Sequence, residues 1–272
     1  MANSCLQTKL KEVVNNDKLP KVGELVLYIN STSTINTSII KQGDNPVELR
    51  ASSGVTITSG GTKYPKFTGT GCAFVKEKSA IIELITSSNM NDPYITLKYE
   101  DIKYCSQLQN LAIYNNNVDG LNSVENLNVF PILAFMIANY NLTGNLANCT
   151  TLKNTLQTLS IKNITGLHST MSDLGQFKVL SRIEGWDSTV FSGALEDFVS
   201  HRYILGETYK NGDLYIRYPH FNENVTFLGS SITPMQEGTL QWSVSGDDVS
   251  VTWGGESTII HVNNDGTWTR VS

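Results

Sequence analysis

Charged side chains are scarce in this sequence. Only 17% of its 272 residues are Asp, Glu, Lys or Arg, whereas about 25% is typical of soluble proteins. The formal net charge is -5 and the pI is about 5.4. This balance excludes a broadly basic surface as the default, so we expect no nucleic-acid partner.

Residue types that dominate catalytic and metal sites are also scarce, with four His and four Cys. Cys5, Cys72, Cys105 and Cys149 form no Cys-x-x-Cys pair and lie at no zinc-ligand spacing to a His, so we expect free, buried thiols. Motifs for phosphate loops, dinucleotide-binding turns, hydrolase elbows and zinc proteases are missing. The sequence therefore predicts no enzyme, no catalytic residue, no metal site and no cofactor.

Long apolar runs are absent as well. The longest apolar-rich stretch covers residues 129–138, far short of the ~20 residues of a membrane-spanning helix. At the N-terminus no basic cluster precedes an apolar stretch. We expect neither a secretory signal nor a membrane partner.

What the sequence does contain is a repeat. The apolar frame Leu108, Leu111 and Ile113 recurs after 24 residues, recurs again, and fades at the fourth step. The later positions are Ile132, Phe135 and Ile137, then Leu156, Leu159 and Ile161, then Leu180, Ile183 and Gly185. Alternating apolar residues predict a short strand in each unit, and equal steps predict parallel pairing of successive strands.

The frame resembles the leucine-rich repeat, whose units are about 20–29 residues long. The first unit matches this pattern best, through Leu108, Leu111, Ile113, Asn116, Val118 and Gly120. The resemblance implies an inward Asn that hydrogen-bonds the backbone where the chain leaves the strand. Here the recurring Asn115, Asn139 and Asn163 follow the Ile by two residues rather than three. We therefore do not assume standard repeat geometry.

The remaining strand positions predict a partner-binding surface. In register they form two rows, Ala112, Met136, Ser160 and Glu184, and Tyr114, Ala138, Lys162 and Trp186. In a solenoid such positions line the concave face. Exposed Ala, Met, Tyr and Trp would be unusual in bare solvent, so either another part of the protein or a partner covers them.

Both flanks of the repeat have strand patterns separated by Gly, Asn, Asp and Pro. The clearest hairpin joins 239–244 to 249–253, and a second turns at 263–266. We expect a mainly β fold with a short α/β leucine-rich-repeat-like solenoid in the middle and antiparallel β modules at both ends. The expected parts are a docking arm (1–20), a β domain (21–100), the repeat segment (101–200) and a C-terminal β domain (201–272).

The N-terminus carries a second resemblance. Its residues Met1–Leu6, Lys9–Lys11, Val14–Asp17 and Leu19–Glu24 are similar to the opening of proteins encoded by crAss-like phages of gut Bacteroides-type bacteria. There this opening precedes virion surface proteins such as head fibres and decoration proteins. The resemblance covers Met1 to Tyr28.

It implies a short arm that docks on the particle through Leu6, Leu10, Val13 and Val14. Alternatively, these side chains pack on their own domain.

The leading hypothesis is a non-enzymatic phage structural protein, located in the virion as a head fibre or decoration protein. Its expected partners are other virion proteins, further copies of itself and a host surface glycan or protein. One alternative is a bacterial surface adhesin of the leucine-rich-repeat type. Another is a glycan-degrading enzyme using Glu184, Glu196 or Asp197, but we expect these carboxylates to be solvated.

Overall fold

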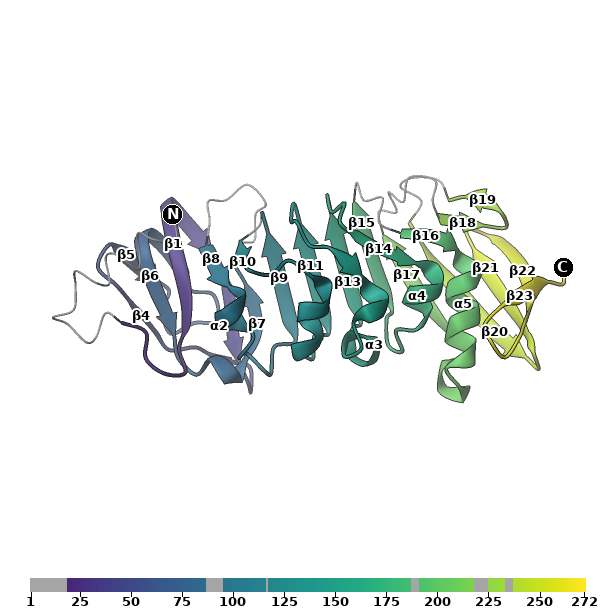
Figure 1. Ribbon diagram of the computed structural model, residues 1–272, viewed down its shortest axis with the longest axis horizontal. Helices are drawn as coiled ribbons and strands as arrows, with labels where there is room; N and C mark the ends of the chain where they lie inside the picture. The colour runs from purple at the N-terminus through teal and green to yellow at the C-terminus, as the bar shows by residue number, and fades with distance from the viewer. Residues whose placement is uncertain (1–18, 87–94, 116, 187–190, 218–224, 233–236) are drawn as a thin grey trace. The chain divides into compact units, whose positions relative to one another are not determined.

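The chain folds mainly into β-strands, as the sequence predicts (Figure 1). The structure, a computed structural model, describes residues 19–86, 95–115, 117–186, 191–217, 225–232 and 237–272. It divides into two compact units, Met1–Leu121 and Asn122–Ser272. This boundary falls inside the repeat segment, and each unit is described by itself below.

An antiparallel sheet forms around two long strands of the first unit. β1 (Leu25–Asn36) pairs with β6 (Lys66–Val75), with a register shift between Ser31 and Ile35. Further strands join them: β4 (Leu49–Ala51) and β5 (Val55–Thr58) pair with β6, β8 (Ile95–Lys98) pairs with β1, and β10 (Val118–Asp119) lies parallel to β8.

The same unit holds a second, mixed set of strands. β7 (Ile81–Ile85) lies parallel to β9 (Asn110–Tyr114) and antiparallel to β2 (Ser38–Lys41), which also pairs with β3 (Asn45–Pro46). A single helical turn, η2 (Lys78–Ala80), precedes β7, and another, α2 (Tyr99–Ile102), follows β8.

An ion pair between half-buried Arg50 and buried Glu24 braces the start of β1 against β4. The guanidinium of Arg50 contacts the carboxylate of Glu24, donating from Nε to Oε1 at 2.9 Å, and lies 4.0 Å from the ring centroid of Phe74. Burial alone would raise the pKa of Glu24, but the Arg50 hydrogen bond and charge hold that pKa below its ordinary value. The pair therefore favours an ionised carboxylate inside the unit.

The expectation of free cysteines holds for two residues and is wrong for a third. Cys105 and Cys149 are buried free thiols, and burial raises the pKa of each to about 12. Cys72 instead forms a disulfide. The cysteine spacing excludes only Cys-x-x-Cys pairs and zinc-ligand sets, so it did not predict a bond between cysteines far apart in the sequence.

In the second unit, residues that are 24 positions apart in the repeat pair with each other in a parallel ladder of strands. β11 (Ala134–Ala138) pairs with β13 (Thr158–Lys162), and β13 pairs with β15 (Arg182–Trp186). Phe135 is opposite Leu159, which is opposite Ile183, and all three side chains are fully buried. The 24-residue steps from Phe135 to Ile183 are thus confirmed as structural register.

The ladder continues past the point where the sequence frame fades. β17 (Gly212–Arg217) pairs in parallel with β15, and Ile183 is opposite Ile216. This last step is longer than the others because α5 (Leu195–Ile204), the longest helix among the described residues, lies between the two strands. A fixed-period search therefore misses β17.

Each step also supplies a short strand to a second parallel ladder and a helical segment. The short strands are β12 (Gly144–Asn145), β14 (Leu167–Thr170), β16 (Phe191–Ala194) and β18 (Val225–Phe227), with β19 (Ser230–Ser231) antiparallel to β18. The helical segments are η3 (Val124–Val129), η4 (Leu146–Asn148), α3 (Leu152–Thr155), α4 (Met171–Gly175) and η5 (Glu207–Tyr209).

The recurring Asn has a different role from the inward Asn expected from the repeat resemblance. Asn115, Asn139 and Asn163 have φ values of 51°, 49° and 51°. Each follows the strand end directly, so Asn supplies the left-handed residue that turns the chain out of the strand. The side chain of Asn163 is exposed, whereas those of Asn115 and Asn139 are half-buried, and Asn163 Nδ2 donates to Asn139 Oδ1 at 2.7 Å.

An antiparallel meander ends the second unit. β20 (Gly238–Ser245), which pairs with β17, is followed by β21 (Asp248–Trp253), β22 (Glu256–Val262) and β23 (Trp268–Arg270). Both predicted hairpins are confirmed. Leu240, Trp242, Val249, Val251 and Trp253 are buried on one face, as the alternation predicts.

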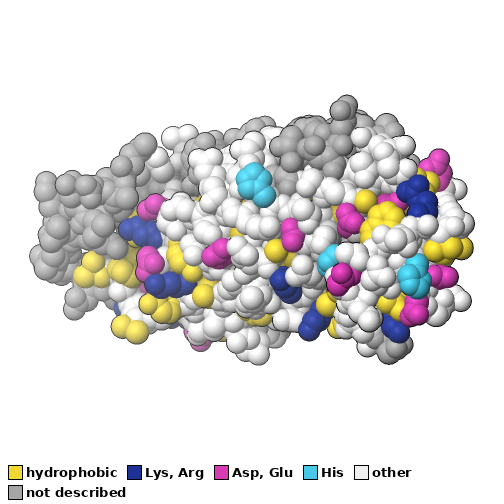
Figure 2. All heavy atoms as spheres, turned by 45° about the vertical axis from the view of Figure 1, so that its right-hand side comes forward, with side chains coloured by type: hydrophobic (Ala, Val, Ile, Leu, Met, Phe, Trp, Pro, Cys, Tyr) yellow, Lys and Arg dark blue, Asp and Glu magenta, His cyan; other side chains and the backbone are white. Residues whose placement is uncertain are grey.

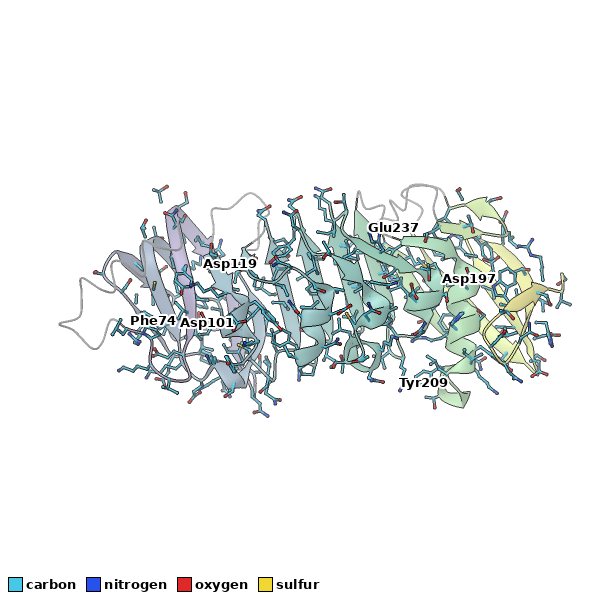
Figure 3. All side chains as sticks on the ribbon, in the orientation of Figure 1. Phe74, Asp101, Asp119, Asp197, Tyr209 and Glu237 are labelled. Carbon is cyan, nitrogen blue, oxygen red and sulfur yellow. The ribbon has the colours of Figure 1, made fainter. Side chains whose placement is uncertain are left out.

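The last hairpin packs against α5 through polar contacts. Asp197 accepts the backbone N–H of Ala194 at 2.9 Å and the Trp268 indole N–H at 2.8 Å (Figure 3). The neighbouring Glu196 is fully buried, accepts the Leu228 N–H at 2.9 Å and lies 3.6 Å from Arg270 Nη2. The expectation of solvated carboxylates is therefore wrong for Glu196.

Candidate functional site

The parallel ladder of the second unit has two unlike faces. Phe135, Leu159, Ile183 and Ile216 are fully buried on one of them. Because side chains alternate along a strand, the neighbouring positions point to the opposite face, which we call the outer strand face. Its positions are Ala134, Met136 and Ala138 on β11, Thr158, Ser160 and Lys162 on β13, Arg182 and Glu184 on β15, and Asp213, Tyr215 and Arg217 on β17.

Five of the eight predicted partner-binding residues occupy this face, and the backbone of a sixth, Trp186, lies in the same register. Met136, Ser160 and Glu184 form one row of register partners, and Ala138, Lys162 and Trp186 form the next. Met136, Ser160, Lys162 and Glu184 are half-buried, whereas Ala138 is buried.

The two remaining predicted residues lie on β9 of the first unit. Ala112 is fully buried, and Tyr114 is half-buried. Burial raises the pKa of the Tyr114 phenol. Ala112 is therefore a core residue of its own unit.

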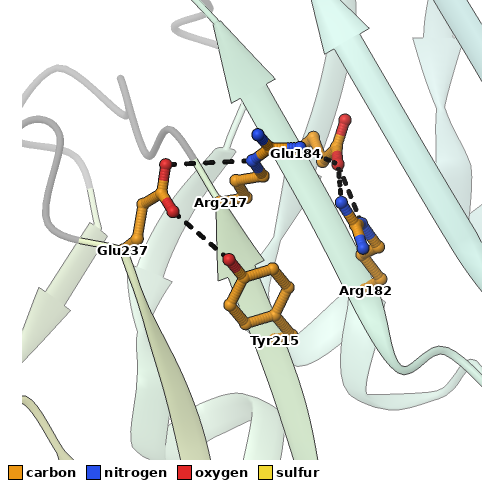
Figure 4. A network of polar contacts seen from close by, with 5 residues as sticks. All are labelled: Arg182, Glu184, Tyr215, Arg217 and Glu237. Atoms are coloured by element: carbon orange, nitrogen blue, oxygen red, sulfur yellow. Dashed lines mark hydrogen bonds and ion pairs between the residues drawn. The ribbon is translucent and has the colours of Figure 1, made fainter.

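Five side chains at one end of the outer strand face form a polar network, shown in Figure 4. They are Arg182, Glu184, Tyr215, Arg217 and Glu237, and we call them the Arg–Glu network. Strand register brings the first four together, since Arg182 is opposite Tyr215 and Glu184 is opposite Arg217. Glu237 directly precedes β20, whose first residue is opposite Ile216.

Glu184 links the two arginines. Its Oε1 accepts hydrogen bonds from Nε of Arg182, at 2.8 Å, and from Nη2 of the same guanidinium. Arg217 Nη1 lies 3.6 Å from the same oxygen. One carboxylate thus fixes the direction of one guanidinium and attracts the other.

Tyr215 and Glu237 complete the network. The Tyr215 hydroxyl donates to Glu237 Oε2 at 3.2 Å, and Arg217 Nε lies 3.8 Å from Glu237 Oε1. The Arg182 guanidinium carbon lies 5.3 Å from the centroid of the Tyr215 ring. The side chains of Arg182, Arg217 and Glu237 are 39%, 37% and 38% exposed, so the network remains accessible to a partner.

Sequence reasoning found only Glu184 among these five residues. Arg182 belongs to a third row of the same register, with Ala134 and Thr158, which the prediction left out. Tyr215 and Arg217 lie on the strand beyond the lengthened repeat step. The alternation of Tyr215, Ile216 and Arg217 is a signal that could have placed both on this face.

The face continues onto the meander with uncharged polar side chains. Thr239 is opposite Tyr215, and Gln241 is opposite Thr252, which is opposite Ser257. Thr239, Gln241 and Ser257 are exposed. On the side of the molecule in Figure 2, charged side chains are likewise scattered among uncharged ones.

Other predicted features lie elsewhere or outside the described residues. The docking residues Leu6, Leu10, Val13 and Val14 fall in the segment that the structure does not describe. Among the described residues, no group of three or more His, Cys, Asp or Glu is placed to hold a metal ion. A search of those same residues finds no helix that is both long and apolar enough to span a membrane.

One Ser–His contact joins α4 to α5. Ser172 Oγ lies 3.1 Å from His201 Nε2, and His201 Nδ1 lies 3.1 Å from the main-chain oxygen of Asp197. In a catalytic triad a carboxylate orients the His, whereas here a backbone carbonyl occupies that position. The contact therefore lacks the third member of a triad.

Comparison of the chain with protein-family models and with curated proteins finds no match.

Proposed function

We propose that this protein is a non-enzymatic structural protein of a phage particle, a head fibre or capsid decoration protein, and that its outer strand face contacts the host surface. The Arg–Glu network supports the proposed contact with the host surface, because it presents charged and aromatic groups on a strand face opposite a fully buried core. The N-terminal resemblance to virion surface proteins supports the first part.

We further propose that the central segment is a leucine-rich-repeat-like stack. The constant 24-residue register of β11, β13 and β15 supports this architecture. The second parallel ladder, β12, β14, β16 and β18, supports it too. A stack of strands presents one continuous surface, which suits the binding of a large partner.

Mass spectrometry of purified phage particles tests the virion assignment. We expect the protein among the structural components, associated with other virion proteins. We also expect the purified protein to be a stable homodimer or homotrimer in light scattering. A stable monomer that is absent from particles would contradict the proposal.

Binding of the labelled protein to Bacteroides-type cells tests the role of the outer strand face. We expect the Arg182→Gln and Arg217→Gln double variant to lose about tenfold in binding, since each guanidinium offers charge-assisted hydrogen bonds. The Lys66→Gln and Lys178→Gln double variant removes two exposed lysines outside the network and is the matched control. Equal binding by both double variants would place the contact elsewhere.

A further inference from the structure

The direction of the Arg182 guanidinium is set before any partner arrives. Two of its nitrogens, Nε and Nη2, donate to the same oxygen of Glu184. Register places Arg217 beside Glu184 on the next strand, and neighbouring strands are about 4.8 Å apart. Two half-exposed guanidiniums therefore sit close together, and guanidinium forks match carboxylate groups in geometry.

The same network also presents acceptors. Glu184 and Glu237 are carboxylates that accept but do not donate hydrogen bonds when ionised. They repel a partner that carries only dense negative charge. A partner that carries hydroxyl donors next to its carboxylates satisfies both halves of the network.

The surroundings fit hydroxyl-rich chemistry rather than an apolar interface. The network adjoins the hydroxyl groups of Thr158, Ser160 and Thr239, which both donate and accept hydrogen bonds. Tyr215 adds an aromatic ring with a polar end, a combination suited to amphipathic ligands. Protein interfaces are also enriched in Arg and Tyr, but they are depleted of Glu, Lys and Ser, which this face presents as Glu184, Glu237, Lys162 and Ser160.

Charges of both signs lie on this part of the outer strand face. Arg182 and Arg217 contribute two positive charges to the network, and Glu184 and Glu237 contribute two negative charges. Nearby positions of the same face add one charge of each sign, Lys162 on β13 and Asp213 on β17. This balance suits a partner that carries separate carboxylates among neutral polar groups better than one with dense negative charge.

We propose that the Arg–Glu network binds a carboxylated polysaccharide. The two guanidiniums bind the sugar carboxylates, Glu184 and Glu237 accept hydrogen bonds from sugar hydroxyls, and the Tyr215 ring supports a sugar ring. This inference rests on the proposed host-contacting role of the face and names the chemistry of its partner.

Affinity electrophoresis of the full chain in gels that contain polygalacturonate tests the inference. Uncharged dextran is the neutral comparison, and poly-glutamate tests an acidic polypeptide as the partner. We expect retardation by polygalacturonate only, weakening as added salt screens the charges. The Arg182→Gln and Arg217→Gln double variant should bind about tenfold more weakly.

Two variants keep this test informative. Arg217→Lys retains the charge without the fork, so we expect intermediate binding. The Lys66→Gln and Lys178→Gln double variant should bind like the unsubstituted protein. A circular dichroism spectrum and a melting curve for each variant separate loss of binding from loss of fold.

Equal retardation by dextran, or retardation by poly-glutamate as strong as that by polygalacturonate, would overturn the inference. So would equal effects of the two double variants. If the arginine variant loses binding to host cells while polygalacturonate never binds, the proposed function stands and the partner chemistry is wrong. If neither cells nor polysaccharide depend on the arginines, both fail.

Discussion

At the scale of single residues, Glu196 combines complete burial with incomplete pairing. Its Oε1 accepts the Leu228 N–H, whereas its Oε2 is buried without a hydrogen-bond partner. Burial raises the pKa of this carboxyl above its ordinary value of 4.5. The fold therefore holds the proton more tightly than the unfolded chain does, and this site loses stability as pH rises through the raised pKa.

Glu196→Gln should therefore stabilise the protein in a pH-dependent way. Gln stays neutral at every pH, so the melting temperature of the variant relative to that of the unsubstituted protein should be higher at about pH 8 than at about pH 4. Thermal unfolding at both pH values measures this gain. Glu256→Gln, on the exposed side of β22, is the control. A difference in melting temperature that does not change with pH would contradict the account.

Asn163 tests the left-handed turn at the end of β13. Its φ of 51° suits Asn and Gly but strains a β-branched residue. We expect Asn163→Val to lower the free energy of unfolding by about 1–2 kcal/mol. Urea unfolding measures the loss. Asn163→Gly should cost much less, and equal losses for both variants would point to the side-chain bond with Asn139 instead of the backbone.

At the scale of elements, adjacent residues of β13 lie on opposite faces, one in the core and the next on the surface. Leu159 is fully buried between Phe135 and Ile183, and the adjacent Ser160 points to the outer strand face. Leu159→Ala should cost about 2–5 kcal/mol of unfolding free energy. Ser160→Ala should change it by no more than about 0.5 kcal/mol. Similar urea midpoints for the two variants would contradict this arrangement.

The start of β17 depends on a glycine beneath a tryptophan. A Cβ added at Gly212 would lie 2.8 Å from Cζ2 of Trp242. We expect Gly212→Ala to destabilise the protein by about 1–3 kcal/mol through overpacking. Denaturant unfolding followed by tryptophan fluorescence measures the cost. Gly60→Ala is the control, because its Cβ would meet only Ile57 Cγ2 at 3.6 Å. An equally large cost there would contradict the steric explanation.

Much of the element-scale structure was readable from the sequence, because period and burial are local signals. The 24-residue frame placed Phe135, Leu159 and Ile183 in one row, and alternation placed both C-terminal hairpins. Pairing of Arg217 with Glu184 was not readable, since it depends on a step lengthened by α5. Burial of Glu196 was not readable either, because acidic residues at helix starts are usually solvated.

At the scale of the whole molecule, the described part of each unit contains a buried carboxyl with a shifted pKa, and the two shifts have opposite signs. Glu24, held by Arg50 in the first unit, stabilises the fold above its lowered pKa and loses this effect as pH falls through it. Glu196 in the second unit acts in the other direction. The two units therefore respond to pH in opposite senses at these sites.

We propose that this protein lies on the outside of a phage particle and presents its outer strand face there. A cryo-EM map of the purified particle is the decisive measurement. We predict density for the fold on the particle surface, with Arg182 and Arg217 open to solvent. Absence of this fold from the particle surface, or burial of that face against another virion protein, would contradict the claim.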